Sequence, residues 1–340
     1  MKVAIYGAGA MGTILGAYIT KAGYKIDLIT RNVEHVKGLR KNGAHVIGKT
    51  DFIQPVSALL PEEMKEKYDI ILLMTKQMDN KKIVKGLLKF MTKDAVICTM
   101  QNGLPELSVS EVIGKEKTFG CTMSWGATFV GNGVCELTSE ATRESLTFSI
   151  GKFGNSGNNQ AFNYIIELLN TMGEVKIEKN FIGARWAKLL VNAAFSGLSV
   201  ITNSNFGKIA KDKKSRMLAL MAIKECIDVA KAANIKIEPI QGKDVEKLMD
   251  YHSKFKKWIS FQLLPIAMKK HKLIKSSMIR DILRGRKCEI DSINGVVCKY
   301  GDMVQIETPI NDRIVEITHK IENKELDFSW DNLMLLEDLL

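Results

Sequence analysis

A glycine-rich turn near the N-terminus constrains this chain more than any other feature. The sequence G-A-G-A-M-G follows Lys2–Tyr6, which predicts a buried strand, and opens Met11–Ala22, which predicts an apolar helix. In this setting glycines permit a tight turn, a close backbone approach to a pyrophosphate, and close helix–strand packing. A tight turn without a ligand is the alternative. The pattern favours a dinucleotide site formed by Gly7, Gly9, Ala10, Met11 and Gly12.

Short β-rich runs then alternate with helical stretches as far as about residue 180. The expected strands are Lys2–Tyr6, Lys25–Thr30, Asp69–Thr75, Ala95–Met100, Thr118–Ser124, Gly133–Thr138, Ser145–Gly151 and Glu174–Glu178. The expected helices are Met11–Ala22, Asn80–Phe90, Pro105–Ile113 and Gln160–Met172. Residues 43–56 read as extended and hairpin-like. This alternation predicts an α/β domain of Rossmann type, a doubly wound, mostly parallel sheet with helices on both faces.

The pattern changes from Gly183 onward, where helical periods dominate and strand signals vanish. We therefore expect a dinucleotide-binding domain over residues 1–180 and an all-helical substrate and catalytic domain over residues 181–340.

The end of the second strand bears on the choice of cofactor. NAD-binding folds usually place an acidic residue there to hold the ribose 2′-hydroxyl. This chain has Thr30-Arg31-Asn32 instead, and Asp27 lies too early in the strand. Arg31 can pair with a 2′-phosphate in a fork geometry; an exposed arginine without that role is the alternative. NADP(H) is the favoured cofactor.

One face of the helix that begins near Gly183 is polar. Lys188, Asn192 and Ser196 are spaced four residues apart within an otherwise apolar sequence, so they share a face. Buried polar groups are costly unless they find partners or a ligand. Lys188 can act as a proton donor to a carbonyl oxygen; a lysine whose head reaches solvent beside a satisfied polar patch is the alternative.

A second candidate group is the carboxylate of Glu289. On a continuous helical period Glu289 shares a face with Ile282, Ile293 and Val296. A carboxylate in such an apolar stripe calls for a partner, for which Lys188 is a candidate. An intrahelical pair with Arg286, three residues earlier, is the alternative.

Composition excludes several classes of function. The formal net charge is +11, but the basic residues are spread along the chain and match no nucleic-acid-binding module. The six cysteines have no framework spacing and the five histidines form no ligand pair, so we expect reduced thiols and no metal site. No stretch is long enough to cross a membrane, and the first twenty residues lack a cleavage site, so we expect a cytoplasmic protein.

In ordered blocks along nearly its whole length, the chain resembles the ketopantoate reductases (2-dehydropantoate 2-reductases) of the 6-phosphogluconate dehydrogenase-like superfamily. The blocks are G-A-G-A-M-G, T-K-Q at 75–77, Q-N-G at 101–103, and the two helical stretches around Lys188 and Glu289.

The resemblance implies roles for individual residues. Lys76 lies beside the cofactor, Asn102 contacts cofactor and substrate, and Ala127 falls near the cofactor-binding loop. In the helical half, Lys188 matches the general acid and Asn192 the group that holds the substrate hydroxyl.

Two more residues complete the set. Ser277 matches a contact to the substrate carboxylate, and Glu289 an acid that orients the lysine and touches the cofactor ribose.

Three positions depart from the family pattern. Ser196, assigned here to the substrate site, stands where typical members carry a second asparagine. Phe206 and Ile274 replace two further asparagines. Because sites that hydrogen-bond a substrate discriminate strongly, these changes bear on the substrate more than on the chemistry.

The expected activity is NADPH-dependent reduction of a 2-oxo acid to a 2-hydroxy acid, with ketopantoate as the first-choice substrate, as in pantothenate biosynthesis. A paralogous reductase of a less polar 2-oxo acid is the main alternative, and a non-catalytic NADP-sensing module is the more remote one. A homodimer is compatible with the sequence, and no nucleic-acid or membrane partner is expected.

Overall fold

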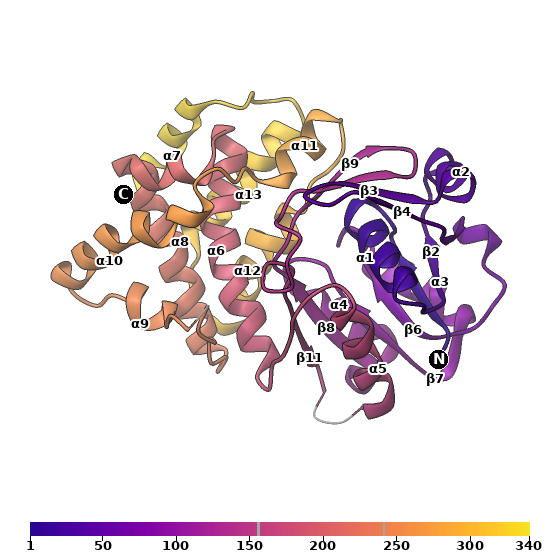
Figure 1. Ribbon diagram of the computed structural model, residues 1–340. Helices are drawn as coiled ribbons and strands as arrows, with labels where there is room; N and C mark the ends of the chain where they lie inside the picture. Colours follow the sequence, from indigo (N-terminus) through magenta and orange to yellow (C-terminus); the bar gives the residue numbers. More distant parts are fainter. Residues whose placement is uncertain (155–156, 241) are drawn as a thin grey trace. The chain divides into compact units, whose positions relative to one another are not determined.

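An eight-stranded sheet organises the N-terminal part of the chain (Figure 1). Its strands are β1 (Val3–Tyr6), β2 (Ile26–Ile29), β5 (Ser57–Leu59), β6 (Tyr68–Leu73), β7 (Met91–Thr99), β8 (Thr118–Met123), β11 (Phe148–Lys152) and β12 (Val175–Ile177). Their order across the sheet is β12-β11-β8-β7-β6-β1-β2-β5. Six neighbouring strands of this order, β8, β7, β6, β1, β2 and β5, run parallel to one another. Strand β11 is antiparallel to β8 and parallel to β12. The expected doubly wound, mostly parallel sheet is thus confirmed.

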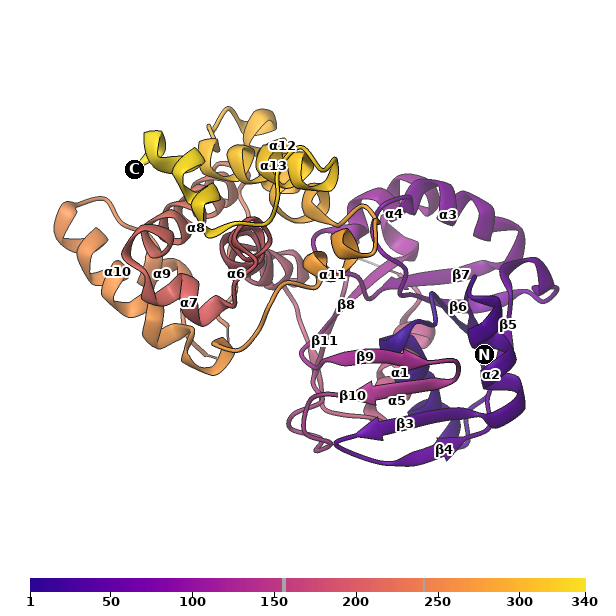
Figure 2. The ribbon, with the colours of Figure 1, turned by 90° about the horizontal axis from the view of Figure 1, so that it is seen from above.

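Helices cover both faces of this sheet, as expected (Figure 2). They are α1 (Ala10–Lys21), α2 (Val33–Asn42), α3 (Asn80–Leu87), α4 (Pro105–Ile113) and α5 (Asn159–Asn170). Successive side chains of a strand point to opposite faces. In β1, Val3 and Ile5 join the hydrophobic cluster on the α1 side, while Ala4 joins the cluster that contains Val84 of α3 and Val109 of α4.

A smaller four-stranded sheet lies against α1 (Figure 2). Its order is β4-β3-β10-β9, with β3 (Ala44–Gly48), β4 (Phe52–Gln54), β9 (Ala127–Gly131) and β10 (Val134–Leu137). The antiparallel pair β3–β4 confirms the hairpin expected within residues 43–56. Strand β9 and helix α2 were not predicted. Helix α1 contacts all four strands of this sheet and also packs on β1 and β2, so it is covered on two sides.

The structure describes residues 1–154, 157–240 and 242–340, and they divide into two units. The first unit comprises Met1–Gln101 and Pro105–Phe181, and the second comprises Asn102–Leu104 and Ile182–Leu340. The second unit is helical, as expected. Its helices are α6 (Phe181–Thr202), α7 (Phe206–Lys211), α8 (Lys213–Ala232), α9 (Val245–Met249), α10 (Lys254–Ala267), α11 (Ser277–Leu283), α12 (Ile290–Val304) and α13 (Pro309–Glu322).

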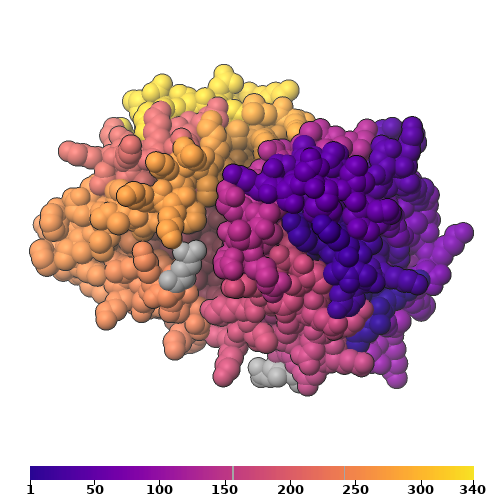
Figure 3. All heavy atoms as spheres, viewed as in Figure 1, coloured from indigo at the N-terminus to yellow at the C-terminus, as the bar shows by residue number. Residues whose placement is uncertain are grey.

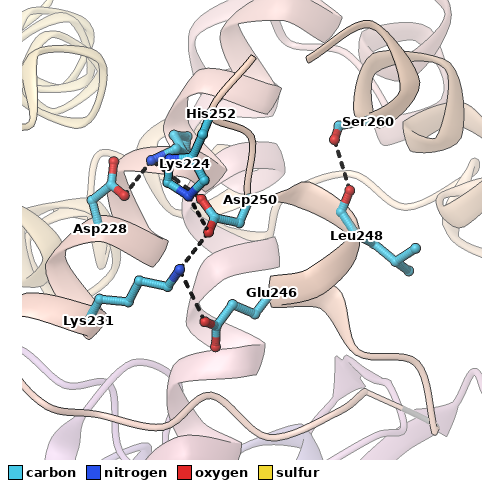
Figure 4. A network of polar contacts seen from close by, with 8 residues as sticks. All are labelled: Lys224, Asp228, Lys231, Glu246, Leu248, Asp250, His252 and Ser260. Carbon is cyan, nitrogen blue, oxygen red and sulfur yellow. Dashed lines mark hydrogen bonds and ion pairs between the residues drawn. The ribbon is translucent and has the colours of Figure 1, made fainter. Parts of the chain in front are cut away.

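Short α9 is fastened to its neighbours by side-chain contacts (Figure 4). Asp250, just after α9, lies between Lys224 and Lys231 of α8, with Nζ–carboxylate distances of 3.4 and 2.5 Å. The buried Ser260 hydroxyl of α10 donates to the Leu248 carbonyl at 2.8 Å. These contacts fix α9 and α10 on α8, and the orange residues of this segment form much of the second unit's visible surface in Figure 3.

Candidate functional site

The glycine turn after β1 has the conformation that its glycines were predicted to permit. Gly7 has φ +106°, in the region that favours glycine, and a Cβ there would lie 2.4 Å from the backbone nitrogen of Thr75. A Cβ on Gly12 would lie 3.0 Å from the Gly7 carbonyl oxygen and from Ile5. Gly7 therefore allows the turn, and Gly12 lets α1 pack on β1.

Gly9 lies over open space. Among the described residues, no atom comes within 4 Å of where its Cβ would be. Gly9 is also the N-cap of α1, and within the described chain no side chain caps this end and no acid occupies the first turn. The N-terminal N–H groups of a helix attract anions. The turn and the backbone of Ala10, Met11 and Gly12 therefore fit the pyrophosphate of a dinucleotide.

Arg31 follows β2 and is exposed. Its guanidinium lies beside the Tyr6 phenol, where it opposes the rise in the Tyr6 pKa that burial causes. The nearby acid Asp27 accepts hydrogen bonds from Ser57 at 2.6 Å and Tyr68 at 2.9 Å. Asp27 therefore has two hydrogen-bond partners, on β5 and β6, and the contact of Arg31 with a 2′-phosphate stays a prediction.

A buried histidine missed by the sequence analysis supports the glycine turn. His35 of α2 is fully buried, and its Nδ1 accepts the Gly133 N–H at 2.9 Å. Its Nε2 therefore carries the proton and donates to Thr13 Oγ1 of α1, at 2.9 Å. Burial lowers the pKa of His35 to about 4. The signal that could have revealed α2 is Asn32, whose side chain caps it.

Phe129 of β9 packs edge-on against the His35 ring, with centroids 4.9 Å apart. Ala127, half-buried, begins this strand. The hairpin β9–β10 therefore connects the predicted contact at Ala127 to α2.

The T-K-Q and Q-N-G blocks are joined by one side chain. The buried Gln101 amide donates to the Thr75 carbonyl at 2.8 Å and exchanges hydrogen bonds with the side chain of Asn80, the first residue of α3. Lys76, exposed, follows Thr75, and Asn102, half-buried, follows Gln101. Gln101 therefore holds the loop that carries Lys76, a role the sequence analysis did not assign.

The predicted polar stripe lies on a single helix. Lys188 and Asn192 are half-buried and Ser196 is buried, and all belong to the 22-residue α6. At 1.5 Å per residue the stripe is about 12 Å long. Most of the remaining α6 surface is buried and apolar. The helical spacing expected for these three residues is confirmed.

The expected helical setting of Glu289 is wrong. Helix α11 ends at Leu283, and α12 begins at Ile290 with Glu289 as its N-cap residue. Gly285, at φ +66°, ends α11: its N–H donates to the Ile282 carbonyl and that of Arg286 to the Asp281 carbonyl, at 2.8 and 2.9 Å.

Glu289 therefore shares no helix with Ile282 or Arg286, so Glu289 and Arg286 are not placed as an intrahelical pair. Glu289 is nonetheless buried, at 8% exposure, in the same unit as Lys188. A pair between Lys188 and Glu289 stays a prediction.

Ser277 begins α11 and is exposed. The preceding residue, Ser276, is buried, and its N–H donates to the Ser199 hydroxyl of α6 at 3.0 Å. This bond attaches the start of α11 to α6, the helix of the polar stripe.

Two departures from the family pattern are neighbours. The Phe206 N–H donates to the Ile274 carbonyl at 2.9 Å. The Phe206 ring packs on Phe195, with centroids 5.6 Å apart, and Phe195 directly precedes the third departure, Ser196. Phe206 and Ile274 are therefore neighbours, and Phe206 packs on the residue that precedes Ser196 in α6.

Two further classes of site are absent from the described ranges. Across residues 1–154, 157–240 and 242–340 no three His, Cys, Asp or Glu side chains converge as a metal site would require. Over the same ranges no helix has the length and apolar character to span a bilayer.

Two family models match the chain. The model "Ketopantoate reductase PanE/ApbA" covers residues 3–150, and "Ketopantoate reductase PanE/ApbA C terminal" covers residues 180–322. A 2-dehydropantoate 2-reductase of Pyrococcus horikoshii is 27% identical over 92% of this chain and 94% of its own length. One of Lactococcus lactis is 26% identical over 95% and 98%.

Solved structures share the fold. D-mandelate dehydrogenase in a ternary structure with NADH and anilino(oxo)acetate has a TM-score of 0.79 at 23% identity, covering 95% of this chain and 99% of that one. A PanE/ApbA family ketopantoate reductase of Ralstonia eutropha JMP134 has a TM-score of 0.78 at 23% identity, covering 96% and 99%.

Proposed function

Because this chain belongs to the ketopantoate reductase family, a family of oxidoreductases that act on CH–OH groups, we propose that it reduces a 2-oxo acid to a 2-hydroxy acid with NADPH. Ketopantoate is the first-choice substrate, which would place the enzyme in pantothenate biosynthesis. The polar stripe of α6 is the observation that carries the proposal, since it sets a lysine and two hydrogen-bonding groups into a buried apolar helix.

The first unit supports the cofactor assignment. Gly9 leaves room for a pyrophosphate at the end of α1, and Arg31 offers a guanidinium where NAD-binding folds place an acid. Lys76, Asn102, Ala127 and Glu289 are proposed as further cofactor contacts. NADPH, when bound, supplies the hydride that the carbonyl carbon accepts.

The second unit supplies the other chemical groups. The Lys188 ammonium gives a proton to the carbonyl oxygen as negative charge develops there, so a 2-hydroxy acid results. Asn192 hydrogen-bonds the oxygen that becomes the hydroxyl group of the product, and Ser196 makes a further contact to the substrate. Ser277 holds the substrate carboxylate, Asn102 contacts the substrate at the nicotinamide end, and Glu289 orients Lys188.

A less polar 2-oxo acid is a second candidate substrate. Phe206 and Ile274 are neighbours, and both carry apolar side chains in place of the family's asparagines. Loss of the two amide groups favours an apolar substituent on the substrate over the hydroxylated one of ketopantoate. The D-mandelate dehydrogenase with a similar fold was solved with anilino(oxo)acetate.

A steady-state screen of 2-oxo acids, run in parallel with NADPH and NADH, tests these assignments. We expect NADPH-dependent turnover, with the highest kcat/KM for ketopantoate. A higher kcat/KM for a bulky apolar 2-oxo acid would establish the second candidate. Binding of NADPH without turnover of any 2-oxo acid would refute the reductase and favour a nucleotide-sensing module.

A further inference from the structure

A buried network of polar side chains joins four helices of the second unit. Asn294 of α12 donates from its amide nitrogen to the Ala193 carbonyl of α6 and to Oδ1 of Asn311 of α13, both at 2.9 Å. The Asn311 amide nitrogen donates in turn to Oε2 of Glu225 of α8, at 2.7 Å. Asn294 and Asn311 are fully buried.

Both ends of this network accept hydrogen bonds. The Ala193 end is a carbonyl oxygen. The Glu225 carboxylate also accepts the backbone N–H groups of Ile310 and Asn311 at 2.8 and 3.0 Å, which caps the first turn of α13 from the neighbouring helix. Because both ends are acceptors, each asparagine amide fits in only one orientation. The network therefore specifies one arrangement of the four helices.

Gly197 lets the helices come this close. It lies one turn after Ala193 on α6, and a Cβ there would be 2.5 Å from Ile314 of α13 and 2.9 Å from Oδ1 of Asn294. Both distances are below van der Waals contact, so α12 and α13 approach α6 where its side chain is missing.

The contact point lies among the residues of the proposed chemistry. Ala193 directly follows Asn192 and lies between Lys188 and Ser196 on α6, and Asn294 is five residues after Glu289. Apolar contacts tolerate a small slide of one helix along another, whereas a buried hydrogen bond to one carbonyl does not. A slide of one residue would displace a side chain by about 1.5 Å.

We propose that Asn294, held in turn by Asn311 and Glu225, is a positioning residue that fixes the register of α6 against α12, and through it the placement of Lys188 relative to Glu289. The inference rests on the proposed function for its catalytic consequence but not for its structural content.

Asn294→Ala tests this, with Asn332→Ala as its matched control. The Asn332 side chain, which is also buried, donates to the Ile201 carbonyl at 2.9 Å, so it makes the same kind of bond near the end of α6. Both variants should lower the Tm. Only Asn294→Ala should lower kcat, by about tenfold, with the Kd of NADPH unchanged.

A second readout does not need turnover. Competitive acylation of the Lys188 amine across a pH series, followed by mass spectrometry, reports the titration of this group directly. We expect the labelling profile to move in Asn294→Ala and to coincide with wild type in Asn332→Ala. If the Lys188 labelling profile of Asn294→Ala coincides with those of wild type and Asn332→Ala, the positioning role is refuted, even if the Tm of Asn294→Ala is lowered.

Glu225→Gln provides a variant at the far end of the network, which remains informative if Asn294→Ala does not fold. A glutamine keeps the shape but has one acceptor oxygen in place of two, so its NH2 group must face an N–H of Ile310 or of Asn311, which weakens the anchor of Asn311. The Lys188 profile should then move in the same direction, to a smaller extent. An unchanged profile in folded Glu225→Gln would overturn the proposal. If the wild-type protein turns over no 2-oxo acid, only the proposed reductase function is refuted. The proposal about the register of α6 against α12 is still tested, because the labelling comparison needs no turnover.

Discussion

Lys188 is the residue on which the proposed chemistry depends most directly. In Lys188→Ala the carbonyl oxygen loses its proton donor, and general acid catalysis is worth about a hundredfold or more in kcat. We expect kcat to fall by at least that factor while the Kd of NADPH, followed by fluorescence, stays within about twofold of wild type. Lys213→Ala, at the exposed start of α8, is the control. Turnover that survives the loss of Lys188 would refute the assignment of the general acid.

Arg31 determines the preference between the two nicotinamide dinucleotides if the proposed 2′-phosphate contact is correct. Arg31→Ala removes a charged fork from that phosphate, and we expect kcat/KM with NADPH to fall about tenfold or more. With NADH, which has no 2′-phosphate, kcat/KM should be unchanged. Lys37→Ala, an exposed lysine of α2 that pairs with Glu34, controls for a general loss of positive charge. Equal losses with both cofactors would contradict the prediction.

His35 makes stability depend on pH. Its folded-state pKa of about 4 lies below the usual 6.5, so the folded protein disfavours the protonated ring. The stability tied to the neutral ring is present above pH 6.5 and is lost as the pH falls through 4, by roughly 3 kcal/mol in total. Urea unfolding between pH 6.5 and 4 should show this fall in the free energy of unfolding in wild type. The same fall is expected in His271→Gln, a control at an exposed histidine. The fall should be smaller in His35→Gln, and an unchanged fall there would contradict the assignment.

At the scale of elements, Gly197 allows α6, α12 and α13 to pack closely. Gly197→Ala would place a Cβ against Ile314 and Asn294, and we expect it to lower the free energy of unfolding by about 2 kcal/mol. The same substitution at Gly86 of α3, where no described atom lies within 4 Å of the new Cβ, should instead raise it by about 0.5–1 kcal/mol. Denaturant unfolding of both variants measures the contrast. Equal changes in the free energy of unfolding at the two positions would show that helix propensity, and not the close approach of the helices, determines the effect of Gly197→Ala.

The elements that could be predicted are those whose signals are local. Helix α4 begins and ends where expected, because Pro105 marks its first turn. Strand β9 was missed although it forms a hairpin with β10, which was expected, because its five residues are half-buried or exposed and show no alternating pattern. The break between α11 and α12 was missed although Gly285 is a typical C-terminal signal, because the apolar period continues across it by coincidence.

The same division holds for the candidate site. Helical spacing was enough to place Lys188, Asn192 and Ser196 on one face, since period alone determines it. Gln101, His35 and Asn294 were not assigned roles, because each acts through a partner more than 20 residues away in sequence. No periodic pattern encodes such a contact.

At the scale of the whole molecule, the net charge of +11 should accelerate the capture of anionic ligands. Stopped-flow association of NADPH should slow by roughly threefold or more between about 20 and 300 mM potassium chloride, because salt screens long-range attraction. The dissociation rate should change less. Sucrose at matched viscosity is the control. If the association rate constant of NADPH does not depend on salt, the positive charge of the protein does not act on NADPH as it approaches the cofactor site.

The two-sided covering of α1 has a thermodynamic consequence. A helix held between two sheets, with its first turn tied through Thr13 and His35 to a neighbouring helix, has little freedom left to lose when a pyrophosphate arrives. A loop that becomes ordered only when its ligand binds loses conformational entropy at that step. Here that loss was incurred when the chain folded, so the affinity for the dinucleotide draws on a rigidity that the protein already maintains in its absence.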